Sequence, residues 1–228
     1  MKYAVIGTGK TGQAILDLLP APDVVAVFNS RNPVTVEKLR QADVGIVFVP
    51  GKALGEMLPL LLEAKMPLVI GTTGYAWPVD LDAKLRAMNM PWIIGQNFSV
   101  GLNVMRYFSE RIKQSLNALK PKQAQLSIVE KHHIHKVDAP SGTAIYIARA
   151  LDVPPENIAS IREGDVKGTH TVSFDWPHDR ISVTHEALDR AAFAEGVVLA
   201  CNQIHKLTAG LHDFEKLADD MIRNAVKG

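Results

Sequence analysis

YAVIGTGKTG, residues 3–12, is a short apolar run that leads directly into three spaced glycines. The run at 3–6 predicts a buried strand, and apolar residues at helical spacing follow the glycines. Gly7 permits a tight turn, Gly9 lets the backbone approach a pyrophosphate, and Gly12 allows close packing of a helix on the strand. A strand, a glycine turn and a helix in this order are typical of a dinucleotide-binding domain.

Apolar runs and amphipathic segments continue to alternate after this turn. The apolar runs predict further buried strands, and the leucine-rich and mixed segments between them have helical spacing. Buried strands that alternate with helices indicate a parallel sheet covered on both faces. We therefore predict an α/β domain at 1–100, with a Rossmann-type doubly wound parallel sheet. Its further strands are expected at 24–28, 44–49, 67–70 and 92–94, and two of its helices at 54–62 and 81–88.

The pattern changes after residue 100. Polar and apolar residues alternate at 123–130, 169–175 and 180–187, as they do in strands with one face open to solvent. Met105, Phe108 and Ile112 form one stripe of a helix before them. We expect a second, α+β domain at 101–204 with a mixed or antiparallel sheet, for binding the substrate and for oligomerisation.

Composition excludes several classes of protein. Hydrophobic residues make up 47% of the 228 and charged residues 21%, and the net charge of +1 offers no basic field for nucleic acid. Cys201 is the only cysteine, so no intramolecular disulfide forms. No apolar run reaches the roughly 18 residues that a membrane span needs. We expect a cytoplasmic protein with no nucleic-acid or membrane partner.

The glycine turn and the end of the second strand predict the cofactor. A carboxylate at that strand end would accept from the ribose hydroxyl of NAD, and this sequence has none there. Ser30 and Arg31 are instead suited to a 2′-phosphate, although a solvated Arg31 is the alternative. We expect NADPH or NADH, with NADPH slightly favoured. The candidate cofactor-binding residues here are Gly7, Thr8, Gly9, Lys10, Thr11, Gly12, Asn29, Ser30 and Arg31.

Two more glycine-bearing stretches follow the fourth and fifth strands of the predicted sheet. Ligands of doubly wound sheets bind at the carboxyl ends of the strands, which is where these stretches lie. We therefore expect them to line the nicotinamide-ribose site, with Phe98 as a wall for the ring. The candidate residues are Gly71, Thr72, Thr73, Gly95, Gln96, Asn97 and Phe98.

EKHHIHKVDAPSGTA, residues 130–144, is a polar stretch that contains three histidines, two lysines and an aspartate, side chains that can take part in catalysis. It is a metal site, a solvated loop or an acid–base site. Its three histidines are too close in sequence to converge from one regular strand, and we expect no metal. Ser141 is a natural N-cap, and the amides of Gly142 and Thr143 at a helix N-terminus suit an anion. Histidine and lysine beside such a cradle suit a carboxylate substrate whose C=C or C=N bond takes up hydride and a proton.

The same stretch resembles the signature of the 4-hydroxy-tetrahydrodipicolinate reductase (dihydrodipicolinate reductase) family of lysine and diaminopimelate biosynthesis. It matches the pattern E-x-H-H-x-x-K-x-D-x-P-S-G-T-A at every fixed position. The similarity extends to the glycine turn, to GTTG at 71–74, NFSVG at 97–101, HEALDR at 185–190, FAEG at 193–196 and GLHD at 210–213. It covers nearly the whole chain and implies an NAD(P)H-dependent oxidoreductase.

The resemblance also implies residue roles. His132 is similar to the family's catalytic acid–base, and Lys136 to its proton donor and carboxylate contact. His133, Gly142 and Thr143 are expected to hold the carboxylates of a small dicarboxylate substrate, and Ser141 joins them as a candidate. A homotetramer is expected, with a C-terminal helix at 205–228 that packs back onto the first domain.

The sequence departs from the family pattern at a few positions, and two other functions remain as alternatives. Ile134, Gln96 and Asn29 stand where the family often has a polar or basic residue, a proline and an acid, and His135 receives no role. A different imine or amino-acid dehydrogenase on the same scaffold is the alternative enzyme. A non-catalytic nucleotide sensor is the alternative outside enzymes.

Overall fold

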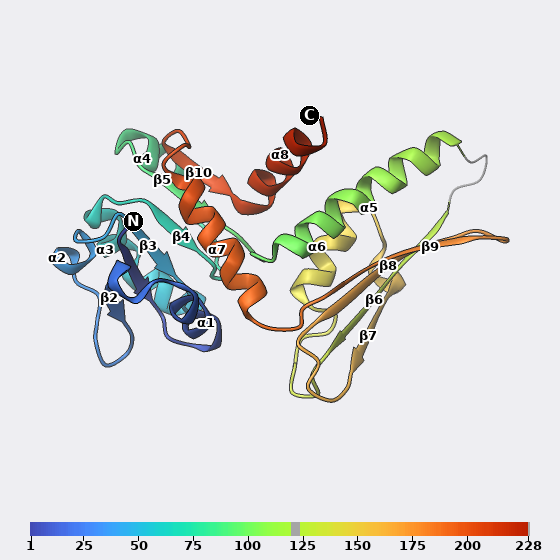
Figure 1. The fold of residues 1–228 in the computed structure, drawn as a ribbon, viewed down its shortest axis with the longest axis horizontal. Coiled ribbons are helices and arrows are strands. Elements are labelled where there is room, and N and C mark those ends of the chain that lie inside the picture. The colour runs from blue at the N-terminus through green and yellow to red at the C-terminus, as the bar shows by residue number, and fades with distance from the viewer. Residues whose placement is uncertain (120–123, 228) are drawn as a thin grey trace. The chain divides into compact units, whose positions relative to one another are not determined.

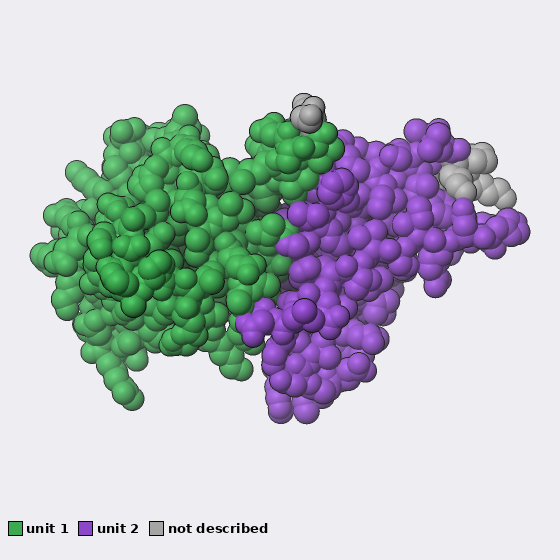
Figure 2. Space-filling model, in the orientation of Figure 1, with its two compact units in different colours: residues 1–100, 190–228 green, residues 101–189 purple. Residues whose placement is uncertain are grey.

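The computed structural model describes residues 1–119 and 124–227. The chain forms two compact units, the first made of Met1–Val100 with Arg190 onward and the second of Gly101–Asp189 (Figure 2). The chain thus re-enters the first unit at Arg190, earlier than the expected boundary at 204. Gln123, where one strand was expected to begin, lies outside the described residues.

Unit 1 contains a six-stranded sheet whose strands are all parallel. Its order is β10-β5-β4-β3-β1-β2, so the chain winds outward in both directions from the β1–β3 pair (Figure 1). This confirms the predicted doubly wound sheet, and β10 is an addition to it. The strands are β1 (Tyr3–Ile6), β2 (Val24–Phe28), β3 (Val44–Val47), β4 (Leu68–Ile70), β5 (Pro91–Ile94) and β10 (Gly210–Asp213).

Helices cover both faces of this sheet because its strands bury alternate side chains on each side. Ala4 and Ile6 of β1 belong to one core with α2, α3 and α4. Tyr3 and Val5 belong to the other core with α1, α7 and the start of α8. The helices are α1 (Lys10–Leu18), α2 (Val36–Leu39), α3 (Gly51–Ala64), α4 (Leu81–Ala87), α7 (Ala191–Ile204) and α8 (Phe214–Lys227), with 3-10 turns at Ala21–Asp23 and, in unit 2, at Pro155–Asn157.

The C-terminal segment differs from the single helix expected at 205–228. Residues 210–213 form β10, which pairs with β5, and α8 begins only at Phe214. Helix α7 lies against α1 and was not expected as a helix (Figure 1). Its sequence, AAFAEGVVLACNQI, is apolar on nearly all sides, so it lacks the polar face that reveals a surface helix.

Unit 2 is a mixed four-stranded sheet with helices on one face. The order is β7-β6-β8-β9, with β6 and β7 parallel and the other pairs antiparallel, which confirms the predicted α+β unit. Ile128, Val172 and Phe174 pack under α5 and α6 in its core. The opposite face is polar, with Thr171 bonded to Thr184 at 2.9 Å. The elements are α5 (Val100–Leu119), β6 (Gln125–His132), α6 (Gly142–Ala150), β7 (Ile158–Arg162), β8 (Thr169–Asp175) and β9 (Arg180–Glu186).

Among the described helices, none combines the length and the apolar character that a membrane crossing requires.

Candidate active site

The glycine turn between β1 and α1 has the tight geometry that its spacing predicts. Gly7 has a φ of 98°, and its N–H donates to the carbonyl of Phe28 at 2.9 Å. A Cβ at Gly7 would lie 2.1 Å from the carbonyl oxygen of Phe48, and one at Gly12 would lie 2.0 Å from that of Gly7. At Gly9 the same position faces open space. The turn therefore excludes side chains where the backbone packs and leaves Gly9 open, which fits a pyrophosphate.

Two cavities adjoin this turn. A cavity of about 650 Å³ lies at the ends of β1, β2 and β3 and is lined by Gly7–Gly9, Asn29, Ser30 and the apolar side chains of Val34, Met57 and Leu60. Its size and apolar walls suit an adenosine group. A second cavity, of about 260 Å³, is lined by Gly9–Gly12, Gly71 and Thr73. It includes the start of α1, whose free N–H groups suit phosphate oxygens.

The turn after β2 is held by the side chain of Asn29. Its Oδ1 accepts from the backbone N–H of Arg31 at 2.9 Å and of Asn32 at 3.1 Å. The amide oxygen is thereby used within the turn, which places Ser30 on the larger cavity and Arg31 at an exposed position. The strand end next to this cavity carries no carboxylate, and its backbone is fixed by the Asn29 side chain.

The two glycine-bearing loops after β4 and β5 adjoin a third cavity, of about 130 Å³, lined by Thr72, Gly95 and Gln96 among others. Thr72 donates its hydroxyl to the carbonyl of Val49 at 2.8 Å, which ties the loop to the end of β3. The N–H groups of Gln96 and Asn97 both donate to one oxygen of Glu215, at 2.8 and 3.0 Å. The C-terminal segment therefore fixes the backbone of the loop at 95–98.

Glu215 was not expected at this site, because it lies 118 residues from Asn97 in sequence. It is buried at the start of α8. Burial, together with the neighbouring Asp213 carboxyl, raises the pKa of Glu215 to about 7.

The ring of Phe98, expected as a wall for the nicotinamide, is buried among other aromatic rings. Only 2% of the residue is exposed, and the ring stacks on Phe214 with centroids 4.5 Å apart and packs against Phe48. Phe98 therefore supports its loop from within the core, and its expected role as a wall for the nicotinamide ring stays a prediction. Burial of aromatic surface decides this position.

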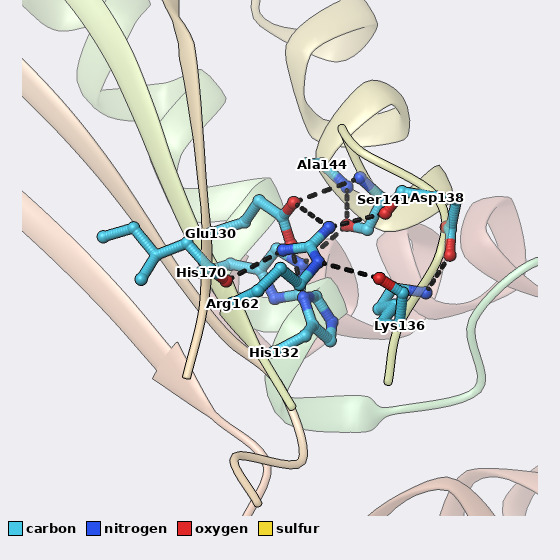
Figure 3. Close-up of polar contacts among 9 residues, drawn as sticks. Glu130, His132, Lys136, Asp138, Ser141, Ala144, Arg162 and His170 are labelled. Carbon is cyan, nitrogen blue, oxygen red and sulfur yellow. Dashed lines mark hydrogen bonds and ion pairs between the residues drawn. The ribbon is translucent and has the colours of Figure 1, made fainter. Parts of the chain in front are cut away.

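In unit 2, the end of β6 and the start of α6 bring together most of the polar stretch at 130–144 (Figure 3). His132 is the last residue of β6, and a turn closed by the Lys136 N–H to the His133 carbonyl, at 3.1 Å, follows it. Ser141 caps α6, its hydroxyl accepting from the N–H of Ala144 at 3.1 Å. Ser141 is buried, so its hydroxyl serves the helix and His170 at 3.4 Å, while Gly142 and Thr143 form the first turn.

Lys136 and Gly142 already share a carboxylate within the chain. The Lys136 ammonium lies 2.8 Å from Oδ1 of Asp138, and the Gly142 N–H donates to the same side chain. Burial raises the pKa of Asp138, but the Lys136 ammonium and the backbone N–H groups of Asp138 and Gly142 together lower it, so the net pKa is lowered. The two groups expected to bind substrate thus bind an anion here, which shows that their geometry suits a carboxylate.

Glu130 lies at the centre of a buried polar network and is fully inaccessible to solvent. One of its oxygens bonds Nδ1 of His132. The other accepts from Arg162 at 2.8 Å and from the backbone N–H of Ser141 at 3.3 Å (Figure 3). Burial alone would raise the pKa of Glu130, but the hydrogen bond from Arg162 and the other partners lower it. The group is therefore an anion at neutral pH.

Burial lowers the pKa values of two histidines in this network, His132 and His170. Burial lowers the pKa of His132, while Glu130 opposes that effect. Burial lowers the pKa of His170 to about 3, with the His132 ring, 5.2 Å away between centroids, as the next cause. His170 is therefore neutral at physiological pH, and His132 is the histidine of this pair with a carboxylate partner that favours its protonated form.

His133 and His135 lie outside this network. Their rings face each other with centroids 6.3 Å apart, and His135 is exposed. His133 is half-buried and stands next to the turn that carries Lys136.

Glu130, His132 and His170 form the group of potential metal ligands found among the described residues. The carboxylate of Glu130 already accepts from His132, Arg162 and Ser141. The cation that neutralises it is the guanidinium of Arg162, so the donor set is arranged as an ion-pair network. This arrangement favours acid–base chemistry over metal binding.

Arg162 and His170 were missed in the sequence because they lie on other strands. The register of the sheet pairs His132 with Arg162 and Glu130 with His170. No pattern in the local sequence predicts such cross-strand pairs. The sequence feature that comes closest to such a signal is a charged residue at an inward-facing position of an alternating strand.

Comparisons with known proteins give one family. Residues 101–217 match the family model described as dihydrodipicolinate reductase, C-terminus. A 4-hydroxy-tetrahydrodipicolinate reductase of Christiangramia forsetii is 31% identical over 98% of this chain and 100% of that protein. One of Magnetococcus marinus is 32% identical over 78% of this chain and 74% of that protein.

A solved structure shares the fold. The dipicolinate-bound dihydrodipicolinate reductase of Paenisporosarcina sp. TG-14 has a TM-score of 0.73 with 21% identity, covering 95% of this chain and 98% of that one.

Proposed function

Because the chain belongs to the dihydrodipicolinate reductase family, we propose that unit 2 carries the groups that bind the substrate and transfer the proton, and that unit 1 binds the cofactor. The reaction is the NAD(P)H-dependent reduction of 4-hydroxy-tetrahydrodipicolinate to tetrahydrodipicolinate in lysine and diaminopimelate biosynthesis. In balance, the substrate takes up a hydride and a proton and releases its hydroxyl group as water.

His132 is the proposed acid–base group. The observation that carries this role is the bond between its Nδ1 and the buried, ionised Glu130, because it leaves Nε2 as the atom that exchanges a proton. A glycine stands opposite that atom. A Cβ at Gly168 would lie 3.1 Å from Nε2, so a side chain there would obstruct it.

Lys136 is the proposed contact for a substrate carboxylate and a second source of a proton. Its ammonium and the Gly142 N–H now hold the Asp138 carboxylate, and a substrate carboxylate takes the same type of contact. His133 and Thr143, on either side of this pair in sequence, are proposed to hold the remaining carboxylate oxygens. Ser141 contributes by starting α6, which orients the amides of its first turn.

The cofactor is proposed to bind along the carboxyl edge of the sheet in unit 1. The adenosine is assigned to the larger cavity, and the pyrophosphate to the turn formed by Gly7, Thr8, Gly9, Lys10, Thr11 and Gly12. The loops at 71–73 and 95–98 would hold the nicotinamide ribose, with the second loop fixed by Glu215. When bound, the nicotinamide supplies the hydride. The chain's own part is to hold and orient this group and to exclude water.

A substrate panel tests the reaction. With NADPH, kcat/KM for 4-hydroxy-tetrahydrodipicolinate is expected to exceed that for cyclic imines with one carboxylate by at least about 10²-fold. A substrate that lacks the second carboxylate leaves the protein groups that bind it without a partner. Higher activity on another imine or on an amino acid would favour the alternative dehydrogenase. Tight NADPH binding without turnover of any substrate would favour the nucleotide sensor.

NADPH is the proposed better cofactor, supported by Ser30 beside the cavity and by the exposed Arg31 on a fixed turn. Arg31→Ala is expected to lower kcat/KM for NADPH about 10-fold, the scale of one charge-assisted contact of about 1.5 kcal/mol, and to leave that for NADH nearly unchanged. Lys38→Ala, another exposed cation, is the matched control. A wild-type preference for NADH would overturn this assignment.

Assembly as a homotetramer in the cytoplasm is proposed on the family resemblance, and the polar open face of the unit 2 sheet is a surface consistent with it. The buried, unpaired Cys201 is consistent with a reducing compartment. The mass in solution is expected to be that of four chains, and the mass of one chain would contradict this assembly.

A further inference from the structure

We propose that Glu130 and Arg162 are positioning residues of the reaction: Glu130 orients His132, and Arg162 links that carboxylate to the turn that carries Lys136. The proposal rests on the proposed function in one respect, since it takes His132 as the proton donor. It assigns roles to two side chains that lie on neighbouring strands, β6 and β7. Neither of them needs to touch the substrate.

The first step of the argument is the orientation of the His132 ring. Its Nδ1 bonds a carboxylate that is completely buried, and its ring stands edge to face against His170 at 5.2 Å between centroids. A histidine with Nδ1 held by a carboxylate keeps its proton on that nitrogen, so its tautomer is set. Nε2 is then always the atom that faces Gly168. Glu130 therefore sets the orientation of the His132 ring and makes Nε2 the nitrogen that reacts.

The second step is the reach of Arg162. Its Nη2 donates to Glu130 at 2.8 Å and to the carbonyl of Asp138, and its Nε donates to the carbonyl of Lys136 at 3.3 Å. One planar guanidinium thus joins the anchor of His132 to both ends of the segment 136–138 (Figure 3). A lysine ammonium is a point charge without this fork, so it cannot replace the geometry. Through Arg162, the positions of the two catalytic candidates depend on each other.

The third step is the charge around His132. Glu130 on β6 favours its protonated form, while Arg162 on β7 and Lys136 in the following turn oppose it. His170 on β8 is neutral, and the next histidine along the sheet, His185 on β9, also has a pKa lowered by burial. Burial is the largest cause of the lowered pKa of His132. Glu130 is thus the one described anion that keeps the proton available there.

These opposed charges give opposite predictions for two variants. A proton donor works while it is protonated, so kcat/KM falls as the pH rises through its pKa. Glu130→Gln keeps the shape but removes the anion, which lowers the pKa of His132 and moves this fall to lower pH. Arg162→Gln removes a cation and moves the fall to higher pH. A purely structural role would not move the two profiles in opposite directions.

The variants also differ in steady-state constants. Glu130→Gln is expected to lower kcat about 10–100-fold, part of the effect of a general acid, with little change in KM. Arg162→Lys keeps the charge but loses the fork, so it is expected to raise KM about 10-fold with a pH profile close to wild type. Glu163→Gln is the matched control, because Glu163 is an exposed glutamate one residue after Arg162, with a weak pair to Lys131 at 3.6 Å. It is expected to behave as wild type.

The deciding experiment follows the His132 ring by NMR against pH in the wild type, Glu130→Gln, Arg162→Gln and Glu163→Gln, with thermal melts to check that each folds. This titration needs no turnover, so it tests the network even if the chain proves to have another substrate. A His132 pKa lowered in Glu130→Gln and raised in Arg162→Gln supports the proposal. A His132 titration unchanged in folded Glu130→Gln, or a kcat loss no larger than that of Glu163→Gln, overturns it.

Discussion

His132→Asn is expected to lower kcat by at least about 10²-fold, the lower end of the contribution of a general acid–base group. Asparagine keeps an N–H donor for Glu130 and roughly the same position, but it cannot exchange a proton at neutral pH. The loss should therefore appear in kcat more than in KM. Steady-state turnover of 4-hydroxy-tetrahydrodipicolinate at saturating cofactor measures it.

The pH dependence gives this prediction a second readout. In the wild type, the limb of kcat/KM that falls with rising pH belongs to His132, whose pKa is lowered by burial and supported by Glu130. In His132→Asn that limb should disappear, and the residual rate should be flat across the same range. His135→Asn is the matched control, because His135 is exposed and outside the network. Turnover of His132→Asn within about three-fold of wild type would remove His132 from its role, since a general acid contributes about 10²-fold or more.

Lys136→Ala is expected to lower kcat/KM by at least about 10²-fold, because one change removes a charged carboxylate contact and a proton source. The ammonium lies 2.8 Å from Asp138 and is only partly exposed, so its position is defined before substrate arrives. Without it, Asp138 and a substrate carboxylate would stand near each other as unpaired anions. The expected effect is a large rise in KM together with a fall in kcat.

Binding of dipicolinate separates the two roles of Lys136. It carries two carboxylates but undergoes no reduction here, so its affinity reports carboxylate contact alone. Lys136→Ala should weaken this affinity about 10-fold or more, the scale of a charge-assisted hydrogen bond, and Lys136→Arg should retain most of it. Lys131→Ala, a partly exposed lysine of β6, is the control. Unchanged affinity in Lys136→Ala would assign the carboxylates to other groups.

The sequence predicted most of unit 1 because its strands are continuous apolar runs. β1 and β2 were expected at their observed bounds, since each run ends at a polar residue or glycine. β10 and β7 were missed because GLHD has a single apolar side chain and IASIR is short and without clear polar–apolar alternation. Their pairing with β5 and β6 stabilises them, and this long-range contact leaves no local pattern.

The site was predictable only where it is continuous in sequence. His132, Lys136 and the Ser141 cap lie within ten residues of one another, so turn and helix rules place them together. Strand register brings Arg162 and His170 to the site, and the return of the C-terminal segment to unit 1 brings Glu215 to its loop. Rules that use only neighbouring residues in sequence cannot predict such contacts. The burial of Phe98 was not predictable for a related reason, because its neighbours Phe48 and Phe214 come from distant segments.

The transfer of an isotope tests the central claim most directly. Tetrahydrodipicolinate formed from NADPH deuterated at both C4 positions would be analysed by mass spectrometry after a single conversion in ordinary water. The account predicts one deuterium in each product molecule, because the hydride comes from the cofactor and the proton from the chain and solvent. Oxidation of NADPH that leaves the product unlabelled, or no formation of this product, would contradict the assignment of this chain as its reductase.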